Sequence, residues 1–142
     1  MFRKEIPMYT MKQACEEAHM PYQTLKYYCN EGLVPNVRRD SGNRRCFDEA
    51  TVKWIKDLSC LKKCGMSIEE MKTYLALCLE GPASIRKRQA MLAQKRNALL
   101  ASMAGLQDSI DYVDWKQQFY QDVLDGKRPY ISNLIKTEPD SR

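Results

Sequence analysis

The sequence predicts a mainly α-helical protein with one small β-hairpin. Three observations lead to this prediction. Glycine and proline divide residues 10–82 into short segments, a basic turn sequence stands among them, and only Gly105 interrupts residues 83–125. Because helix interiors tolerate proline poorly and glycine at a cost, these residues mark helix ends. The pattern therefore predicts four short helices followed by one long helix.

The first two segments form a helix-turn-helix pattern. We expect the first helix over Met11–Ala18, where Thr10 can cap the amino end. A second helix is expected over Tyr22–Asn30, and Pro21 suits its cap or its first position. Gly32, with a proline shortly after it, ends this helix. Two short helices joined by a tight turn are typical of DNA-binding domains.

Residues 36–47 predict a short β-hairpin with a basic tip. They read NVRRDSGNRRCF, in which Ser41-Gly42-Asn43 is a strong turn signal. Val37 and Phe47 supply apolar anchors at the two ends. A hairpin in this place would be the wing of a winged helix-turn-helix. Paired arginines flank the turn on both sides: Arg38, Arg39, Arg44 and Arg45.

Two further helices follow the hairpin. Asp48 can cap a helix that runs to Cys64 and ends at Gly65. Ser67 and Glu70, three residues apart, form a capping box that opens the next helix. That helix ends where a Glu-Gly-Pro sequence follows.

A long helix is expected from about residue 83 to about residue 125. A helix of about 40 residues spans about 60 Å, which a domain of about 80 residues cannot bury. Apolar residues recur in it at an interval of seven, so a homodimeric coiled coil is the economical interpretation. The alternative is a helix that folds back on its own domain. The repeat consists of Ile85, Leu92, Leu99, Leu106, Val113 and Tyr120.

Together these elements predict a mainly α protein. It has an N-terminal winged helix-turn-helix with a small β-hairpin wing, two further helices and a long C-terminal coiled-coil dimerisation helix. The expected domains are a DNA-binding domain over residues 1–81, the dimerisation helix over 82–126 and a short tail over 127–142. Four apolar residues in the polar tail could dock: Tyr130, Ile131, Leu134 and Ile135.

Composition favours a cytoplasmic protein that contacts an acidic partner. Hydrophobic residues make up 44% of the 142 residues and charged residues 29%. No apolar run approaches the roughly 20 residues of a membrane span, and the first ten residues are too short and too polar for a signal peptide. Residues 1–47 carry eight Lys/Arg against five Asp/Glu. Clustered positive charge favours phosphate contact, although a solvated loop with extra arginines is the alternative.

The six cysteines are interpreted as reduced thiols rather than as three disulfides. Most lie inside helical patterns, no CxxC pair occurs, and the expected compartment is reducing. Cys60 and Cys64 form the one closely spaced pair, at helical i, i+4 spacing. We interpret the other four as packing residues: Cys15, Cys29, Cys46 and Cys78.

Four motifs cover the second helix, the turn after it, the end of the hairpin and the start of the fourth helix. They are TLKYY at Thr24–Tyr28, EGLVP at Glu31–Pro35, Arg45 with Phe47, and CGMSIEE at Cys64–Glu70. In the same order, they resemble the motifs TLRYY, GL-I/V-P, R-x-Y and G-[LF]-S-[LI]-E-E of the MerR family of bacterial transcription regulators. The similarity runs along nearly the whole chain, from about residue 9 to about residue 125.

Four positions depart from the family pattern. His19 stands where the family commonly has glycine, and Pro21 where it commonly has a serine cap. Asn43 replaces the usual hairpin glycine, although asparagine tolerates a left-handed backbone. Lys26 replaces the usual arginine. Because lysine cannot form the bidentate fork of arginine, the base preference is expected to differ.

The second helix is expected to enter the major groove, because its first turns reach base edges in a helix-turn-helix. Gln23 could pair with adenine, and Lys26 with guanine or with a phosphate. Hydroxyl groups can donate to phosphate oxygens, although Tyr28 could instead belong to the core. The wing arginines would straddle the neighbouring backbone. The expected DNA-binding residues are Tyr22, Gln23, Thr24, Lys26, Tyr27, Tyr28, Arg38, Arg39, Arg44, Arg45 and Phe47.

The resemblance implies a homodimer that holds two half-sites of double-stranded promoter DNA. On binding its inducer it would bend and untwist the promoter so that RNA polymerase can use it. Metal-binding members carry cysteines near the far end of the long helix, whereas this sequence has none after Cys78 and one histidine, His19. No metal and no cofactor are therefore expected. An enzyme is not expected either, since no acid/base pair or phosphate loop is present.

Cys60 is the candidate sensor thiol. On a helical wheel Ala50, Trp54, Leu58 and Leu61 define one apolar face, and Cys60 lies nearly opposite it. Its lysine neighbours would favour the reactive thiolate, and Cys64 at the flank could resolve an oxidised Cys60. The lysines are Lys53, Lys56 and Lys63.

The segment around Cys60 also resembles the aldehyde- and thiol-stress-responsive branch of the family, so thiol modification by an aldehyde or an oxidant is the expected switch. In the alternative, this face packs against the partner's long helix and the thiol is inert. The alternative function is an inducer-independent coiled-coil architectural DNA-binding protein.

Overall fold

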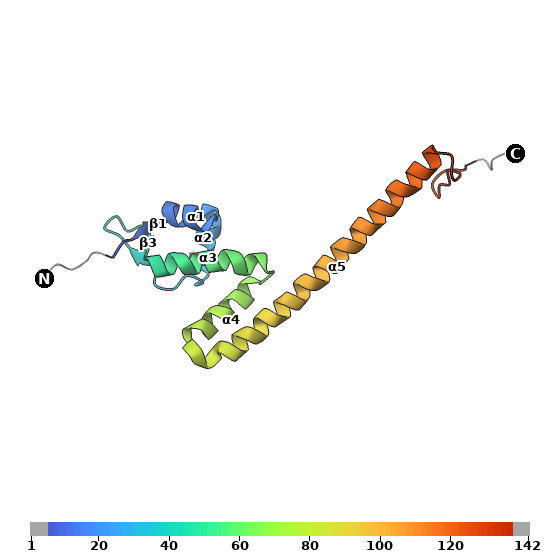
Figure 1. Ribbon diagram of the computed structural model, residues 1–142. Helices are drawn as coiled ribbons and strands as arrows, with labels where there is room; N and C mark the ends of the chain where they lie inside the picture. The colour runs from blue at the N-terminus through green and yellow to red at the C-terminus, as the bar shows by residue number, and fades with distance from the viewer. Residues whose placement is uncertain (1–5, 138–142) are drawn as a thin grey trace. The chain divides into compact units, whose positions relative to one another are not determined.

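The computed structural model describes residues 6–137, whose elements follow the predicted order (Figure 1). These residues form two compact units, 6–99 and 100–137. The prediction of a mainly α protein with a small hairpin and one long helix is confirmed. The elements are β1 (Tyr9–Thr10), α1 (Met11–Ala18), α2 (Tyr22–Asn30), β2 (Arg38–Arg39), β3 (Arg45–Phe47), α3 (Glu49–Lys63), α4 (Ile68–Leu79), a 3₁₀ turn (Gly81–Ser84) and α5 (Ile85–Leu124).

The helix-turn-helix begins with the cap that the sequence predicts. Thr10 Oγ1 accepts a hydrogen bond from the Gln13 N–H at 3.1 Å, and Gln13 Oε1 accepts one from the Thr10 N–H at 2.9 Å. α1 ends at His19, whose φ of 49° lies in the left-handed region that favours glycine. Pro21 then occupies the N-cap of α2 with an extended backbone. These two residues set the tight turn between α1 and α2.

The wing belongs to a three-stranded antiparallel sheet in the order β1-β3-β2. Its tip is a closed turn in which Asp40 Oδ1 accepts hydrogen bonds from the N–H groups of Gly42 and Arg44, both at 2.9 Å. Asn43 adopts a left-handed φ of 60° in this turn. The hairpin agrees with the sequence prediction. The sequence did not predict β1, because a strand of two residues is too short to show an alternation of apolar and polar residues.

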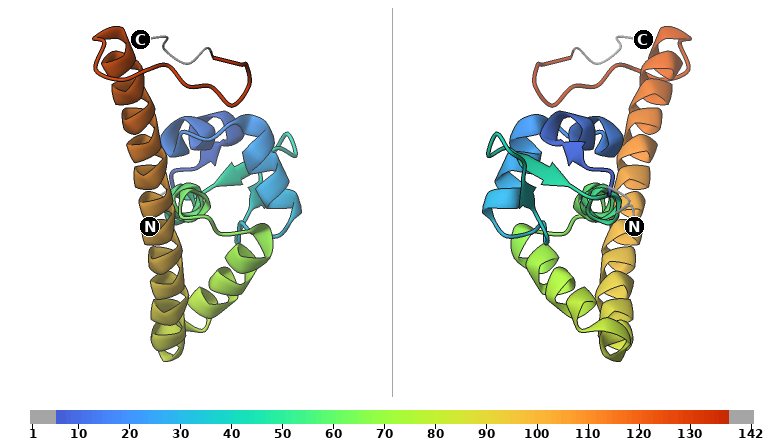
Figure 2. Two further views of the ribbon diagram at one scale, coloured as in Figure 1. Left: turned by 90° about the vertical axis from the view of Figure 1, so that its right-hand side faces the viewer. Right: turned by 90° about the vertical axis from the view of Figure 1, so that its left-hand side faces the viewer.

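α3 lies at the centre of the first unit. Figure 2 shows it end-on, with α1, α2 and α4 arranged around it. Its Trp54 indole N–H donates to the Leu33 carbonyl at 2.8 Å, and the indole stacks on Tyr74 with ring centroids 6.4 Å apart. The most deeply buried large side chains of the core are Leu25, Leu33, Phe47, Ile55, Leu58 and Met71.

The apolar face predicted for α3 is wrong at one residue. Ala50 is exposed, whereas Val52 and Ile55 are buried. The buried side is rotated toward these two residues because α3 packs closely along α1, and the aliphatic side chains fill that contact.

Replacing Asp48 by alanine is expected to lower the free energy of unfolding by about 1 kcal/mol near neutral pH. Asp48 Oδ1 accepts a hydrogen bond from the Thr51 N–H at 2.8 Å and caps α3. This bond, chiefly, holds the pKa of Asp48 below its ordinary 3.8. Because the folded pKa is depressed, the stabilisation is present above the ordinary pKa and is lost as the pH falls through the folded value.

Urea unfolding checks this prediction when the parent chain and Asp48→Ala are compared at neutral pH and at about pH 3. The difference between the two chains should shrink at the lower pH. Asp48→Ser is the matched control, since its hydroxyl caps the helix without titrating and should keep its stability at both pH values. An equal deficit for Asp48→Ala at both pH values would rule out the carboxylate cap as its cause.

α5 is a helix of 40 residues that carries an exposed apolar stripe. Its first turns are joined to the 3₁₀ turn and to the start of α4: Arg88 donates to the Gly81 carbonyl at 2.7 Å, and Lys95 pairs with Glu70 at 2.6 Å. None of the 40 residues of α5 is buried in the single chain. The stripe has exposed fractions between 40% and 65%, in Ile85, Leu92, Leu99, Leu106, Val113 and Tyr120.

The second unit contains an aromatic cluster at the end of α5. Trp115 stacks on Phe119 with ring centroids 6.0 Å apart, and the Lys116 ammonium lies 5.6 Å from the Trp115 centroid. Arg128, just beyond α5, lies 5.3 Å from the Phe119 centroid. Further along the tail, Leu134 is 94% exposed and does not dock on the chain. None of the helices in residues 6–137 combines the length and apolar character of a membrane span.

Candidate nucleic-acid interface

One face of α2 is turned to solvent along the first two turns. Leu25 is buried in the core, and the side chains on the opposite side of the helix are exposed. Tyr22 and Tyr27 are each about half exposed. The exposed face therefore offers an amide, an ammonium group and two phenol hydroxyls, from Gln23, Lys26, Tyr22 and Tyr27.

Two residues predicted to contact DNA lie in the core instead. Tyr28 is 2% exposed and Phe47 is 0% exposed, so neither side chain presents a surface to a phosphate or a base. Burial raises the pKa of the Tyr28 phenol, with a smaller contribution from Tyr27. Phe47 stands at the end of β3, where the core needs a large apolar side chain. The prediction was wrong for Phe47, and for Tyr28 the core alternative is confirmed.

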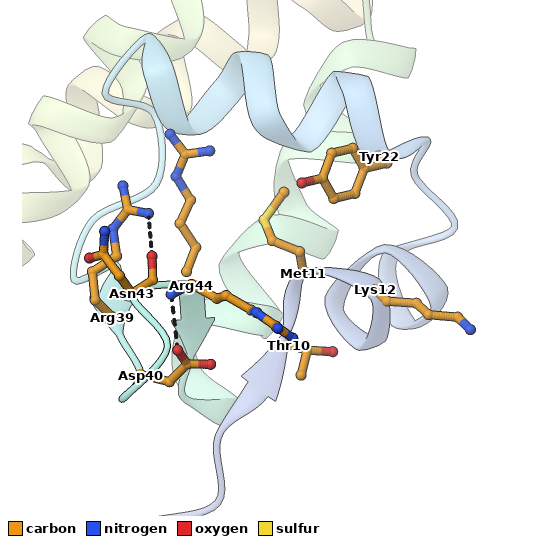
Figure 3. Close-up of a pocket in the computed structure, with 9 residues that line it drawn as sticks. Thr10, Met11, Lys12, Tyr22, Arg39, Asp40, Asn43 and Arg44 are labelled. Carbon is orange, nitrogen blue, oxygen red and sulfur yellow. Dashed lines mark hydrogen bonds between the residues drawn. The ribbon is translucent and has the colours of Figure 1, made fainter.

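A cavity of about 540 Å³ lies between the start of α2 and the wing. In Figure 3 Tyr22 lies on one side of it and Arg39 and Asn43 on the other, with Met11 between them. The cavity is partly basic, because the wing lines it with guanidinium groups. Its volume is larger than that of a phosphate group.

The structure divides the four wing arginines into two pairs. Arg39 donates to the Asn43 carbonyl at 3.1 Å, and Arg45 donates to Asn30 Oδ1 at 2.6 Å. Arg38 and Arg44 are exposed, and within residues 6–137 their guanidinium groups have no hydrogen-bond partner. One pair therefore bonds to the protein, and the other is available to an anion.

Two basic residues beside α2 were not anticipated from the sequence. Lys12 of α1 lines the cavity next to Tyr22. Lys62, near the end of α3, lines a groove of about 420 Å³ together with Gln23 and Thr24. Both lysines belong to helices other than α2. In the sequence, only their positive charge near a helix end could have identified them as candidates.

Cys60 is exposed and Cys64 is half-buried. Two of the three lysines expected to surround Cys60 have carboxylate partners, since Lys56 pairs with Glu17 at 3.3 Å and Lys53 with Glu49 at 4.0 Å. Their field at the thiol is therefore partly compensated.

The next residue, Ser59, donates to the Ala18 carbonyl of α1 at 3.3 Å. The Cys64 N–H donates to the Cys60 carbonyl at 3.0 Å, so a disulfide between the two cysteines would require this turn to unwind. Of the four cysteines interpreted as packing residues, Cys46 is buried and the others are half-buried.

Comparison with known proteins identifies the first unit and its relatives. Residues 9–78 match the family model of the MerR HTH family regulatory proteins. An HTH-type transcriptional regulator of Haemophilus influenzae is 32% identical over 113 residues, covering 80% of this chain and 84% of that protein. The HTH-type transcriptional regulator AdhR of Bacillus subtilis is 34% identical over 88 residues, 62% of this chain and 63% of AdhR.

A solved structure extends the similarity to the fold. The crystal structure of HiNmlR, a MerR family regulator lacking the sensor domain, was determined bound to promoter DNA. It matches with a TM-score of 0.73 and 30% identity over 84% of this chain and 90% of that chain.

Proposed function

Because this chain belongs to the MerR family of DNA-binding transcriptional regulators, we propose that it acts in the cytoplasm as a homodimer on promoter DNA. Each protomer would insert α2 into the major groove and lay the wing on the flanking backbone. The observation that supports this most is the exposed polar face of α2 beside a cavity lined with arginines. HiNmlR, its structural relative, was solved on promoter DNA. The relatives are regulators and not enzymes.

Each exposed side chain has a distinct proposed role. Gln23 would pair with adenine, and Lys26 with guanine or a phosphate. Tyr22 and Tyr27 would donate to phosphate oxygens, with half-buried Thr24 beside them. Arg38 and Arg44 would contact the DNA backbone beside the groove, and Lys12 and Lys62 would add further basic contacts. Arg39 and Arg45 would contribute indirectly, by holding the wing in place.

The exposed stripe of α5 supports a homodimer through this helix. Residues 85–104 contain five basic and no acidic residues, whereas residues 105–124 contain four acidic residues and Lys116 alone as a basic one. Antiparallel pairing would place the basic half of each helix against the acidic half of its partner. Parallel pairing would set like charges side by side, which is unfavourable. We therefore propose an antiparallel pair.

A dimer of this kind could bend and untwist the promoter, because two heads held by one rigid element impose their own spacing on two half-sites. Smooth bending of a site costs on the order of 1–6 kcal/mol, which the phosphate contacts of two heads can offset. RNA polymerase would then use the realigned promoter. Footprinting of a candidate promoter tests the proposal and should show protection of a defined palindrome. Protection without a defined palindrome would favour the architectural alternative.

We also propose Cys60 as the switch. Its thiolate could add to an aldehyde carbonyl, whose oxygen takes up a proton, to give a hemithioacetal. It could instead attack hydrogen peroxide and break the O–O bond, which gives a sulfenic acid with uptake of a proton and release of water. Cys64 could then condense with the sulfenic acid and release a second water once the helix turn unwinds. The exposure of Cys60 supports this role, as does the Ser59 hydrogen bond that joins the same turn of α3 to α1. An adduct at Cys60 would disturb this contact and thereby the helix-turn-helix.

Cys60→Ser is expected to abolish the transcriptional response to an aldehyde or a peroxide while leaving operator binding unchanged. The response is measured on an operator fragment with purified polymerase, and intact-mass spectrometry reports the adduct. Cys78→Ser is the matched control, because this half-buried thiol lies in α4 and should leave the response intact. A full response from Cys60→Ser would remove Cys60 as the sensor.

A further inference from the structure

The carboxyl end of α2 lacks a cation of its own. Its last turn contains no basic residue, and its C-cap is Glu31, which pairs with Lys72 at 3.0 Å. The last carbonyl groups of a helix are unsatisfied within the helix and carry partial negative charge. A positive group supplied from elsewhere in the fold would therefore be favourable at this end.

The wing supplies that group. Arg45 of β3 is half-buried, and its guanidinium donates to Oδ1 of Asn30, the last residue of α2, at 2.6 Å. Arg39 is the cross-strand partner of Arg45 in the register of β2 and β3. Burial raises the pKa of Cys29, and the positive charges of Arg45 and Arg39 oppose that increase. The Arg45 guanidinium therefore lies at the end of α2, and Arg39 is its neighbour on the adjacent strand.

The wing has an ordered tip and a short base. Asp40 closes the tip through two backbone hydrogen bonds, and Arg39 adds a third contact within it. The base consists of β2 and β3, of two and three residues, which pair with each other, and β3 pairs with β1 along its other edge. The hydrogen bond from Arg45 of β3 to Asn30 joins this base to α2 from a second direction.

We infer that Arg45 is a positioning residue, which holds the wing in register with α2 through Asn30 before DNA arrives. The inference rests on the proposed function and refines it, because it removes Arg45 from the phosphate contacts. A wing already in place avoids the ordering cost that would otherwise be paid on binding. Arg44, the neighbour of Arg45, has no such bond within residues 6–137 and remains a phosphate contact.

Asn30→Ala tests the contact without changing the charge of the protein. We expect it to weaken operator binding by about 30-fold, the size of one lost hydrogen bond in each of two heads. Arg45→Gln should weaken binding similarly, and the double variant should be no weaker than either single variant. The slope of log affinity against log salt should stay unchanged in both variants. Arg44→Gln, the matched control, should lower that slope by about one per head and combine additively with Asn30→Ala.

Backbone amide relaxation of the DNA-free protein provides a second measurement. The order parameter of the Gly42 amide should fall in Asn30→Ala and Arg45→Gln and stay constant in Arg44→Gln. Four results would each overturn the inference. They are an Asn30→Ala chain that binds the operator as tightly as the parent, a double variant of Asn30 and Arg45 whose losses of affinity add, a lower salt slope for Arg45→Gln, and an unchanged order parameter of the Gly42 amide. A parent chain that fails to protect an operator would instead contradict the proposed function, and the relaxation result would still decide the role of Arg45.

Discussion

Replacing Leu106 by lysine is expected to produce a folded monomer that binds a two-half-site operator roughly 100-fold more weakly than the parent chain. Leu106 is 65% exposed in the single chain, so a lysine there buries no charge in the monomer. In a paired α5 it would place an ammonium group from each protomer in the apolar stripe, which is costly without a partner. The loss in affinity follows because each head then binds its half-site independently.

Ala104→Lys is the matched control for Leu106→Lys. It introduces the same residue two positions away, about 200° around the helix and outside the stripe, at an exposed position. Sedimentation equilibrium should show a dimer for Ala104→Lys and a monomer for Leu106→Lys, and fluorescence anisotropy at fixed salt should report the two affinities. A Leu106→Lys chain that remains dimeric would show that the stripe of α5 is not the dimer contact.

Lys26→Glu is expected to reduce operator affinity by roughly 100-fold or more. Lys26 lies on the exposed face of α2, and reversing its charge would place a carboxylate against bases or phosphates in each half-site. Truncation of one contact of this kind costs about 1–3 kcal/mol, and the dimer would lose it twice. Because the side chain is exposed, the free energy of unfolding should change little.

Two comparisons make the Lys26 result specific. Lys53→Glu makes the same change of charge on the exposed face of α3, and Lys53 lines neither the cavity nor the groove beside α2. The operator affinity of this variant should therefore remain near that of the parent. Lys26→Arg should restore binding and raise the preference for guanine at one position, since arginine can form the bidentate contact. Equal losses for Lys26→Glu and Lys53→Glu would mean that net charge, and not α2, governs binding.

The short helices and the hairpin were predictable because their signals are local. The caps at Thr10, Asp48 and Ser67 and the turn at Asp40–Arg44 each depend on residues two to four positions apart. The seven-residue repeat of α5 is likewise a property of consecutive turns. It predicts a long helix with an apolar stripe, and that stripe is exposed in the single chain.

The candidate site was only partly predictable, because exposure depends on what packs against a residue from elsewhere. In the TLKYY motif the two tyrosines are adjacent, yet Tyr27 is half exposed and Tyr28 is buried. Sequence spacing alone leaves the orientation of so short a helix open. Lys12 and Lys62 reach the same interface from α1 and α3, and no sequence pattern joins them to α2.

Neighbours along the chain thus suffice to predict the order and approximate ends of the helices, the basic hairpin after the helix-turn-helix and the apolar repeat of α5. Which of the four wing arginines bond to the protein depends instead on the folded arrangement of the elements. Arg45 reaches Asn30, fifteen residues earlier, because folding brings β3 to the carboxyl end of α2. Contacts of this kind depend on the packing of whole elements, whereas a run of paired arginines looks the same in sequence whichever of them is engaged.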